Sequence, residues 1–327
     1  MHTVIKNVTA TLFVLLTFLS AQIKPTVVIT GGNDEIFTNM LSENLSKVLL
    51  ESNRVSKGIG NIDSVKNCFN EIGFKDFGEI LASNKPYTLR KDYNLNMVEL
   101  VGKNQYEVRG IKVRINVEDG DINPNKYMVF TFNKDGLITN VRFSLPSHDY
   151  LEILEEGTSE IENEQRKIII EFLENFGSAY SKKDVEFLEN VFSNDALIIV
   201  GSVTYKKPEF NDMAKTINLY PEKIVSYRQY NKFDYINKLR TYVFPSNKYI
   251  NIQFDDIQIN KHRTMENVYG IKLKQHWKAE KYEDEGYLFL TIYFWEKINP
   301  LILVRVWQDV DFTGDYDISI YDFDIIE

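Results

Sequence analysis

The chain contains the stretch Gly270-Ile271-Lys272-Leu273-Lys274, which repeats Gly110-Ile111-Lys112-Val113-Arg114 at a distance of 160 residues. The segment Tyr287-Leu288-Phe289-Leu290-Thr291-Ile292 repeats Tyr127-Met128-Val129-Phe130-Thr131-Phe132 at the same distance. Antiparallel strands keep such spacing when loops change, because a slip of one residue would turn every core side chain to the other face. The repeat therefore predicts two similar domains.

Each half places helical patterns before strand patterns. In the first half, Asp34 precedes apolar residues that recur at helical spacing up to Leu49, and period-two patterns begin after Pro86. In the second half, helical patterns cover residues 161–180 and 184–192. Further segments expected there are a strand at 195–201, helices at 208–219 and 232–242, and four strands between 249 and 308. Helices followed by antiparallel strands indicate an α+β fold.

The domain boundaries follow from these patterns. We expect an N-terminal α+β domain at residues 22–150, a linker at 151–158, a second domain at 159–308 and an acidic C-terminal strand or tail at 309–327. The acidic residues of the linker indicate a surface connection.

Residues 1–21 have the pattern of a secretory signal peptide. One lysine lies among the first seven residues, residues 8–19 are apolar except for threonines, and Ser20-Ala21 precedes Gln22. The apolar run is too short to span a bilayer. Because Gln22 stands where a lipoprotein would carry its lipidated cysteine, we expect a soluble periplasmic or secreted protein, not a lipoprotein, with no stable membrane insertion after cleavage.

Charge and cysteine content exclude several classes of protein. The chain has 38 basic and 47 acidic residues, a net charge of −9, and loss of Lys6 with the signal peptide gives 37 − 47 = −10. This acidic balance argues against nucleic-acid binding, which needs a concentrated basic surface. Cys68 is the single cysteine, so no intramolecular disulfide can form, and we expect a buried thiol and not a nucleophile.

Residues 161–308 resemble the nuclear transport factor 2-like, or SnoaL-like, superfamily. The resemblance lies in the helix ending Phe176-Gly177-Ser178-Ala179-Tyr180, the turn Lys182-Lys183-Asp184, and the helix-to-strand passage from Phe187 to Gly201. The blocks Gly286-Tyr287-Leu288-Phe289-Leu290 and Val304-Arg305-Val306-Trp307-Gln308 are similar to secreted Gram-negative bacterial members. The resemblance implies a cystatin-like cone, a curved antiparallel sheet wrapped round helices with a mouth for a small molecule. The duplication extends this expectation to the first domain, giving two tandem cones.

The repeat also assigns side chains to faces. Ile111, Val113 and Ile115 alternate with charged and polar residues, so they face the core. The same offset places Gln275 and Trp277 inward and His276 outward, which argues against His276 as a general base. Gln275 either bonds backbone at the mouth of the cone or faces a ligand, and Trp277 is either a ligand-binding wall or core filling.

Two further residue sets have open alternatives. In ketosteroid-isomerase relatives of this fold a tyrosine of the first helix polarises a carbonyl while an acidic residue moves a proton, which implies Tyr180 and Asp195 here; Asp195 could equally cap or turn the chain. Arg305, whose counterpart in the repeat is Arg142, binds a carboxylate if it points inward and supports a salt bridge or a partner if it points outward.

The C-terminal segment resembles a calcium loop in part. Oxygen ligands alternate at Asp309, Asp311, Asp315 and Asp317, but Ile320 stands where the bidentate acid should be. The alternative is a terminal strand at 318–325. No phosphate-binding glycine loop, histidine-rich metal cluster or Ser/His/Asp order is present, so we expect neither a cofactor nor a resident metal.

These residues favour binding over catalysis, because the predicted cavity is aromatic and has few titratable groups. We expect an exported, non-catalytic protein that binds a small apolar or amphipathic ligand or a peptide in the second cone. The binding residues expected are Tyr180, Gln275, Trp277, Tyr293, Arg305 and Trp307. The alternatives are a SnoaL-like isomerase or dehydratase that uses Asp195 and Tyr180, and a structural or assembly component of the bacterial envelope whose sheet faces bind a partner or a second copy.

Overall fold

The computed structural model describes residues 24–32, 34–100, 103–115, 125–155, 161–206, 222–295 and 298–323. The expected signal peptide and the expected helix at 208–219 lie outside the described residues. None of the helices in the described ranges is both long and apolar enough to cross a bilayer.

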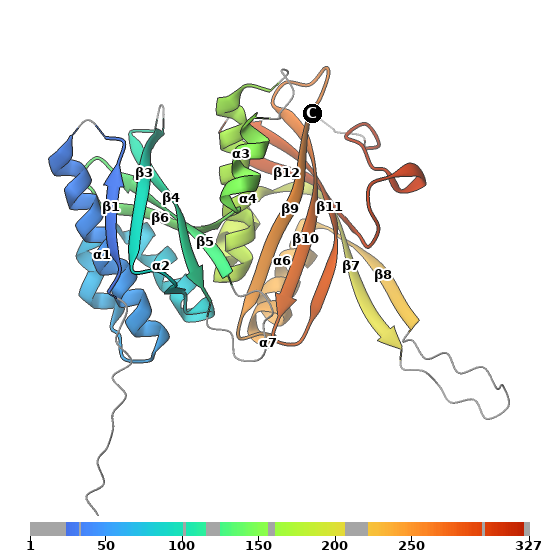
Figure 1. Cartoon of the computed structure of the whole chain (residues 1–327). Coiled ribbons are helices and arrows are strands. Elements are labelled where there is room, and N and C mark those ends of the chain that lie inside the picture. Colours follow the sequence, from blue (N-terminus) through green and yellow to red (C-terminus); the bar gives the residue numbers. More distant parts are fainter. Residues whose placement is uncertain are drawn as a thin grey trace, which may run out of the picture.

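The first sheet carries its helices on one face (Figure 1). Its strand order is β1-β3-β4-β5-β6, with β2 paired to β4. The strands are β1 (Thr26–Thr30), β2 (Tyr87–Thr88), β3 (Asp92–Leu100), β4 (Gln105–Arg114), β5 (Asn125–Asn133) and β6 (Ile138–Ser144). The helices are α1 (Glu35–Ser56), the 3₁₀ helix η1 (Ile62–Cys68) and α2 (Glu71–Asn84). Asp34 caps α1 as predicted, since its carboxylate accepts a hydrogen bond from the Phe37 amide at 3.0 Å.

The second sheet is longer and has the order β8-β7-β12-β11-β10-β9. Its strands are β7 (Phe192–Lys206), β8 (Glu222–Tyr230), β9 (Ile250–Lys261), β10 (Val268–Ala279), β11 (Glu283–Trp295) and β12 (Asn299–Gln308). The helical segments of this half are α3 (Ser147–Glu155), α4 (Asn163–Lys182), α5 (Val185–Val191), α6 (Lys232–Lys238), the π-helical turn η2 (Leu239–Val243), α7 (Phe244–Ser246) and the 3₁₀ turn η3 (Gly314–Tyr316). The sheet and these helices enclose a core built round Phe176, Leu290 and Phe294.

Helix α4 lies between the two sheets (Figure 1). It packs against β6, the edge strand of the first sheet, and against β9, the edge strand of the second. Its own side chains contribute to both contacts, because Ser178 Oγ accepts from the Phe143 amide at 2.8 Å while Phe176 stacks on Phe254 at 6.3 Å. The architecture is α+β, as predicted, with two sheets that fit tandem domains.

The repeat predicts the core face of the first repeated strand correctly. Ile111 and Val113 are buried in the first core, and Ile271 and Leu273 are buried in the second. Gln275 is 4% exposed and shares the inward face with them, as Ile115 does in the first domain.

The pairing registers of the two halves differ by two residues. Ile111 pairs with Met128, and the offset of 160 predicts Leu288 opposite Ile271, but Ile271 pairs with Leu290. A β-bulge between Val108 and Ile111 interrupts the pairing of β4 with β5. The pairing of β10 with β11 has no such interruption. The faces survive because a shift of two residues preserves the strand alternation.

The third repeated strand does reverse its face. Val141 and Phe143 pack in the helix-side core of the first domain, whereas Val304 and Val306 pack on the outer side of the second sheet. A register shift between Thr291 and Ile292 precedes this strand. Arg142 and Arg305 therefore point to opposite sides of their sheets and are not structural equivalents.

Several segments differ from expectation. Strands β1 and β8 have no counterpart among the predicted strands. The sequence also favours a short helix at residues 63–72, where the structure has the 3₁₀ helix η1 followed by the start of α2. Part of the expected linker is helical, since α3 extends to Glu155. The expected terminal strand at 318–325 is not formed by its described residues: Ile318, Ile320 and Phe323 instead cover the outer face of the second sheet.

Candidate functional site

A cavity of about 400 Å³ lies inside the second domain. One wall is the inner face of β10, β11 and β12, and the other is formed by β7 together with the segment from α6 to α7. The residues that matter for its chemistry are Tyr235, Lys238, Asn247, Gln275, Trp277, Lys281, Tyr282, Asp284, Arg305 and Trp307. This volume is in the range of ordinary small-molecule sites.

Two glycines make room for the indole of Trp307. A Cβ atom added to Gly201 would lie 1.7 Å from the indole Cε3, and one added to Gly286 would lie 2.4 Å from its Cε2. Either side chain would displace the ring. Gly201 and Gly286 therefore leave the space that the Trp307 side chain occupies in the cavity wall, where it is 2% exposed.

Arg305 points inward, which decides between the two orientations left open by the sequence. Its Nη1 donates to the carbonyl of Ile199 at 3.3 Å, and its guanidinium lies 5.7 Å from the centre of the Tyr235 ring. The side chain is almost fully buried. Its electrostatic partners among the described residues are the Asp284 carboxyl group and the Tyr180 hydroxyl group.

Four polar atoms at this cavity have no hydrogen-bond partner within the described part of the chain. They are Nε of Arg305, Nε1 of Trp307, Oδ1 of Asp284 and Oδ1 of Asn247. A buried polar atom without a partner costs on the order of 1–3 kcal/mol. All four atoms are enclosed by the protein, so this cost belongs to the packing of the side chains that line the cavity.

Asp284 is the inward acidic residue that sequence reasoning missed. Its Oδ2 accepts a hydrogen bond from the Tyr282 hydroxyl at 2.6 Å, and burial raises the pKa of the carboxyl group. The signal was present: Leu288 and Leu290 face inward, and extending the same alternation toward the start of the strand reaches Asp284.

Tyr180, Gln275 and Trp277 lie together at the inner side of the domain. The rings of Tyr180 and Trp277 pack edge to face at 5.5 Å, and Gln275 and Trp277 line the cavity. Tyr180 is fully buried and its hydroxyl is 2.7 Å from the hydroxyl of Tyr235, so burial raises its pKa. It supports the cavity from behind Tyr235 and Trp277.

The structure does not bring Tyr293 and Asp195 into this site. Tyr293 packs on the outer side of the second sheet, because it lies on the opposite face of β11 from Leu290 and Ile292. Asp195 is exposed on β7, whereas Tyr180 is buried. His276 lies on the outer face, as expected, and forms ion pairs with Asp255 and Glu285.

Three of the four aspartates of the calcium-like segment have separate partners. Asp309 accepts from Tyr227 at 2.6 Å and pairs with Lys223 at 3.0 Å. Asp317 pairs with Lys272, and Asp311 accepts from the Phe312 amide at 2.7 Å. Asp309 and Asp317 are thus paired with different lysines and do not form a shared ligand set for a metal ion.

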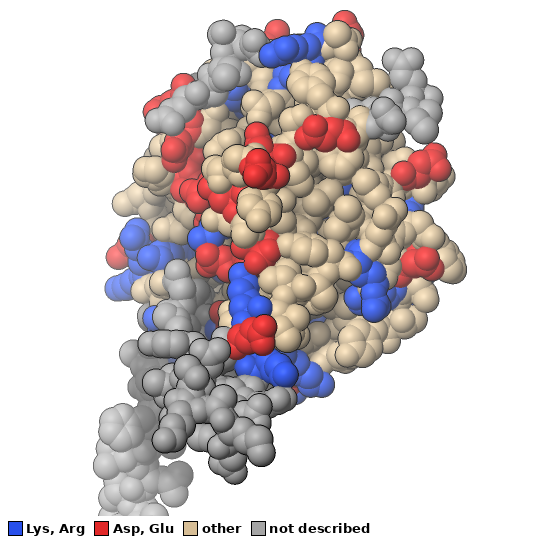
Figure 2. Space-filling view, turned by 90° about the vertical axis from the view of Figure 1, so that its right-hand side faces the viewer, with Lys and Arg blue, Asp and Glu red and all other residues tan. Residues whose placement is uncertain are grey.

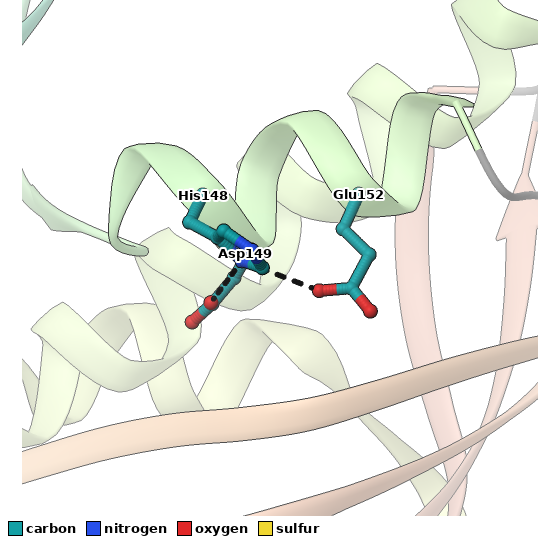
Figure 3. A group of neighbouring side chains, drawn as sticks. All are labelled: His148, Asp149 and Glu152. Carbon is teal, nitrogen blue, oxygen red and sulfur yellow. Dashed lines mark ion pairs between the residues drawn. The ribbon is translucent and has the colours of Figure 1, made fainter.

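Among the described residues, metal-ligand geometry occurs in one group on α3, formed by His148, Asp149 and Glu152 (Figure 3). The ligand atoms lie within 4.8 Å of one another. The His148 side chain is 85% exposed and pairs with both acids at 3.4–3.5 Å. This arrangement is that of an ion-paired helix surface.

The faces of the second sheet are largely covered by its own chain. Helices cover the inner face, and Phe312, Ile320 and Phe323 cover the outer face over Phe289. Gln308 anchors this covering segment by donating to the carbonyls of Val310 and Tyr316 at 2.9 and 3.0 Å. Figure 2 shows the side of β8 and the C-terminal segment, where uncharged residues form much of the surface between scattered charged side chains of both signs.

Comparisons with known proteins add structural neighbours at low similarity. No family model matches the sequence, and no curated protein matches it. Among solved structures, a naphthalene 1,2-dioxygenase with indole in its active site matches with 11% identity and a TM-score of 0.31, covering 51% of this chain and 89% of that chain. The β subunit of benzoate 1,2-dioxygenase from Burkholderia mallei matches with 16% identity and a TM-score of 0.28, covering 47% and 95%.

A third match is the helical cell shape determining protein Pgp2 from Campylobacter jejuni, with 13% identity, a TM-score of 0.32, and coverage of 71% of this chain and 97% of that chain. The chain's own architecture joins a long first helix, a helix-to-strand passage through α5 and β7, and a sheet curved round helices. The second domain thus has the arrangement expected from its sequence, a curved sheet wrapped round helices.

Proposed function

We propose that this chain is an exported, non-catalytic protein that binds a small amphipathic ligand in the cavity of its second domain. The observation that carries the proposal is the cavity of about 400 Å³, whose walls combine Trp277 and Trp307 with a few polar side chains, Gln275, Asp284 and Arg305. A site with apolar walls and a few fixed polar groups is the usual design of a small-molecule pocket. Export rests on the sequence of residues 1–21.

The test uses the neutral fluorescent probe N-phenyl-1-naphthylamine. Val243 lies in the cavity wall, so Val243→Trp should fill part of the volume and abolish the fluorescence enhancement that the wild-type protein gives. Val28→Trp is the matched control, because Val28 is 48% exposed on the first sheet. Enhancement that is unchanged in Val243→Trp would place binding elsewhere and contradict the proposal.

A second candidate function is proton transfer in an isomerase or dehydratase. Asp284, and not Asp195, is the carboxyl group that favours it, because Asp284 lines the cavity and burial raises its pKa toward the range useful for an acid–base catalyst. Carbon-detected NMR titration of the Asp284 carboxyl group, assigned with Asp284→Asn, is the test. A pKa at the ordinary aspartate value would remove the support for this candidate.

A further inference from the structure

We propose that β8 is an interaction edge, to which a second copy of this chain adds its own β8 in antiparallel orientation, so that the second sheets of the two copies become one continuous sheet. This inference does not depend on the ligand of the cavity. It rests on the open edge of β8, on its exposed side chains and on the order of its charges.

The other three sheet edges are covered by the chain itself. Two amides of β1 donate to serine hydroxyl groups of α1, Val27 to Ser46 and Ile29 to Ser42, each at 2.9 Å. Strand β6 packs against α2 and α4, and β9 packs against α3 and α4. Coverage of this kind keeps the edge of a sheet from pairing with another molecule.

Strand β8 is more open than these edges. It pairs with β7 on one side, and α6 contacts it near its last residue, where Lys238 donates to the Tyr230 hydroxyl at 2.7 Å. Together with the end of β7, it extends beyond the helices (Figure 1). A strand inside a sheet bonds to neighbours on both sides, so the second side of β8 offers backbone N–H and C=O groups to a further strand.

Most of the features that normally blunt a strand edge are missing from β8. The strand is nine residues long, contains no proline and pairs with β7 without a register shift. It also exposes large apolar side chains, since Ile224 is 43% and Tyr227 is 52% exposed. Its charged residues are therefore what determines which strand can pair with it.

These charges favour a second copy in one register. When Val225 lies opposite itself across a two-fold axis, Glu222 of each copy lies opposite Arg228 of the other. Both residues are exposed and lie an even number of positions apart, so their side chains share a face, as cross-strand partners must. The register with Ser226 opposite itself places neither charge beside its opposite. Opposite charges across a strand pair stabilise it, and the chosen register forms two such pairs.

Charge reversal tests the pairing. A strand pair of this length buries less surface than a permanent dimer, so sedimentation velocity of the wild-type protein should show a concentration-dependent monomer–dimer equilibrium. Glu222→Arg and Arg228→Glu, each alone, place like charges opposite one another and should weaken dimerisation by about tenfold. The double variant restores opposite charges and should dimerise like the wild-type protein. Near-UV circular dichroism checks that each variant is folded.

A cysteine at the two-fold axis tests the register. Directly opposite residues of an antiparallel pair have Cβ atoms about 4.5–5.5 Å apart, so Val225→Cys should give a disulfide-linked dimer on mild oxidation. Ser226→Cys is the matched control and should not cross-link, because the register places it opposite Ile224. The native Cys68 is buried. A protein that stays monomeric at all concentrations would overturn the inference, as would a dimer that neither responds to charge reversal nor cross-links at position 225.

Discussion

At the scale of single residues, the cavity depends on where side chains are absent. Trp307 occupies space that Gly201 and Gly286 leave open, and its indole forms part of the cavity wall. Glycine at these positions is required by close approach and not by backbone conformation, because neither residue has a positive φ.

Gly201→Ala should destabilise the protein by about 1–3 kcal/mol, because the new methyl group would force Trp307 from its position. The same substitution should weaken probe binding. Urea unfolding gives the first quantity and calorimetry gives the second. Gly78→Ala is the control: its Cβ would meet its nearest neighbour at 3.5 Å inside α2, so helix propensity predicts unchanged or slightly higher stability.

How much of the site could be predicted from sequence also depends on single residues. Gln275 and Trp277 were placed correctly because alternation along one strand fixes the face of each side chain. Tyr293 was assigned to the wrong face, although the same alternation applied to Leu290 and Ile292 excludes it. Arg305 could not be oriented, because both faces of β12 are apolar and a register shift precedes it.

At the scale of elements, the C-terminal segment acts as a cover for the second sheet. Ile320 is 4% exposed and packs with Phe289 and Val304 on the outer face. The alternation of residues predicts a strand here. In the structure, their apolar side chains instead cover the outer face of the sheet, and the segment does not pair as a strand.

Ile320→Ala should therefore lower the free energy of unfolding by about 2–4 kcal/mol, as expected for removal of a buried aliphatic side chain. Tyr316→Ala, in the same segment, should change it by less than about 0.5 kcal/mol, because the Tyr316 side chain is 62% exposed. Equal effects of the two substitutions in urea unfolding would show that the segment does not cover the sheet.

The elements that sequence failed to predict depend on distant pairing. Strand β1 pairs in parallel with β3, more than 60 residues away in sequence, and β8 is the outermost strand of its sheet. Local periodicity identified the long helices α1 and α4 and the repeated strands, because each buries one continuous face. It carries no information about which remote strand completes an edge.

At the scale of the whole molecule, a buried ion network joins the two halves. Glu107, Arg109 and Arg142 of the first sheet converge on Glu174 of α4. Arg142 donates to Glu107 at 2.5 Å and to Glu174 at 3.1 Å. Nearby, the ammonium group of Lys126 donates to the Ile252 carbonyl of β9 at 2.7 Å. The sequence repeat suggested that Arg142 and Arg305 had the same role, whereas Arg142 fixes the interface between domains.

Glu174→Gln should destabilise the protein by about 3–5 kcal/mol, because it leaves two buried guanidinium groups with one carboxylate. Glu171→Gln is the matched control on the same helix: its pair with Lys103 is partly exposed, so the cost should stay below about 1 kcal/mol. Thermal and urea unfolding measured by circular dichroism compare the two. A small effect of Glu174→Gln would show that the network does not stabilise the interface.

The same network predicts the response to acid. Arg142 and Arg109 lower the pKa of Glu107 from 4.5 to about 2 despite its burial. A folded-state pKa below the unfolded value stabilises the protein above the unfolded pKa, so this contribution is complete above pH 4.5 and is lost as the pH falls toward 2. Urea unfolding across this range should show a decline that is smaller in Glu107→Gln, whose stability is already lower at neutral pH. An equally steep decline in the variant would assign the effect to other carboxyl groups.

The most direct test of the cavity as the ligand-binding site is the indole N–H spectrum of the protein during titration with N-phenyl-1-naphthylamine. The chain has three tryptophans, of which Trp277 and Trp307 line the cavity and Trp295 is 55% exposed outside it. The account predicts that the indole N–H resonances of Trp277 and Trp307 shift as the aromatic probe fills the cavity, while that of Trp295 stays in place. Resonances of Trp277 and Trp307 that do not move at saturation, or a change confined to Trp295, would contradict it.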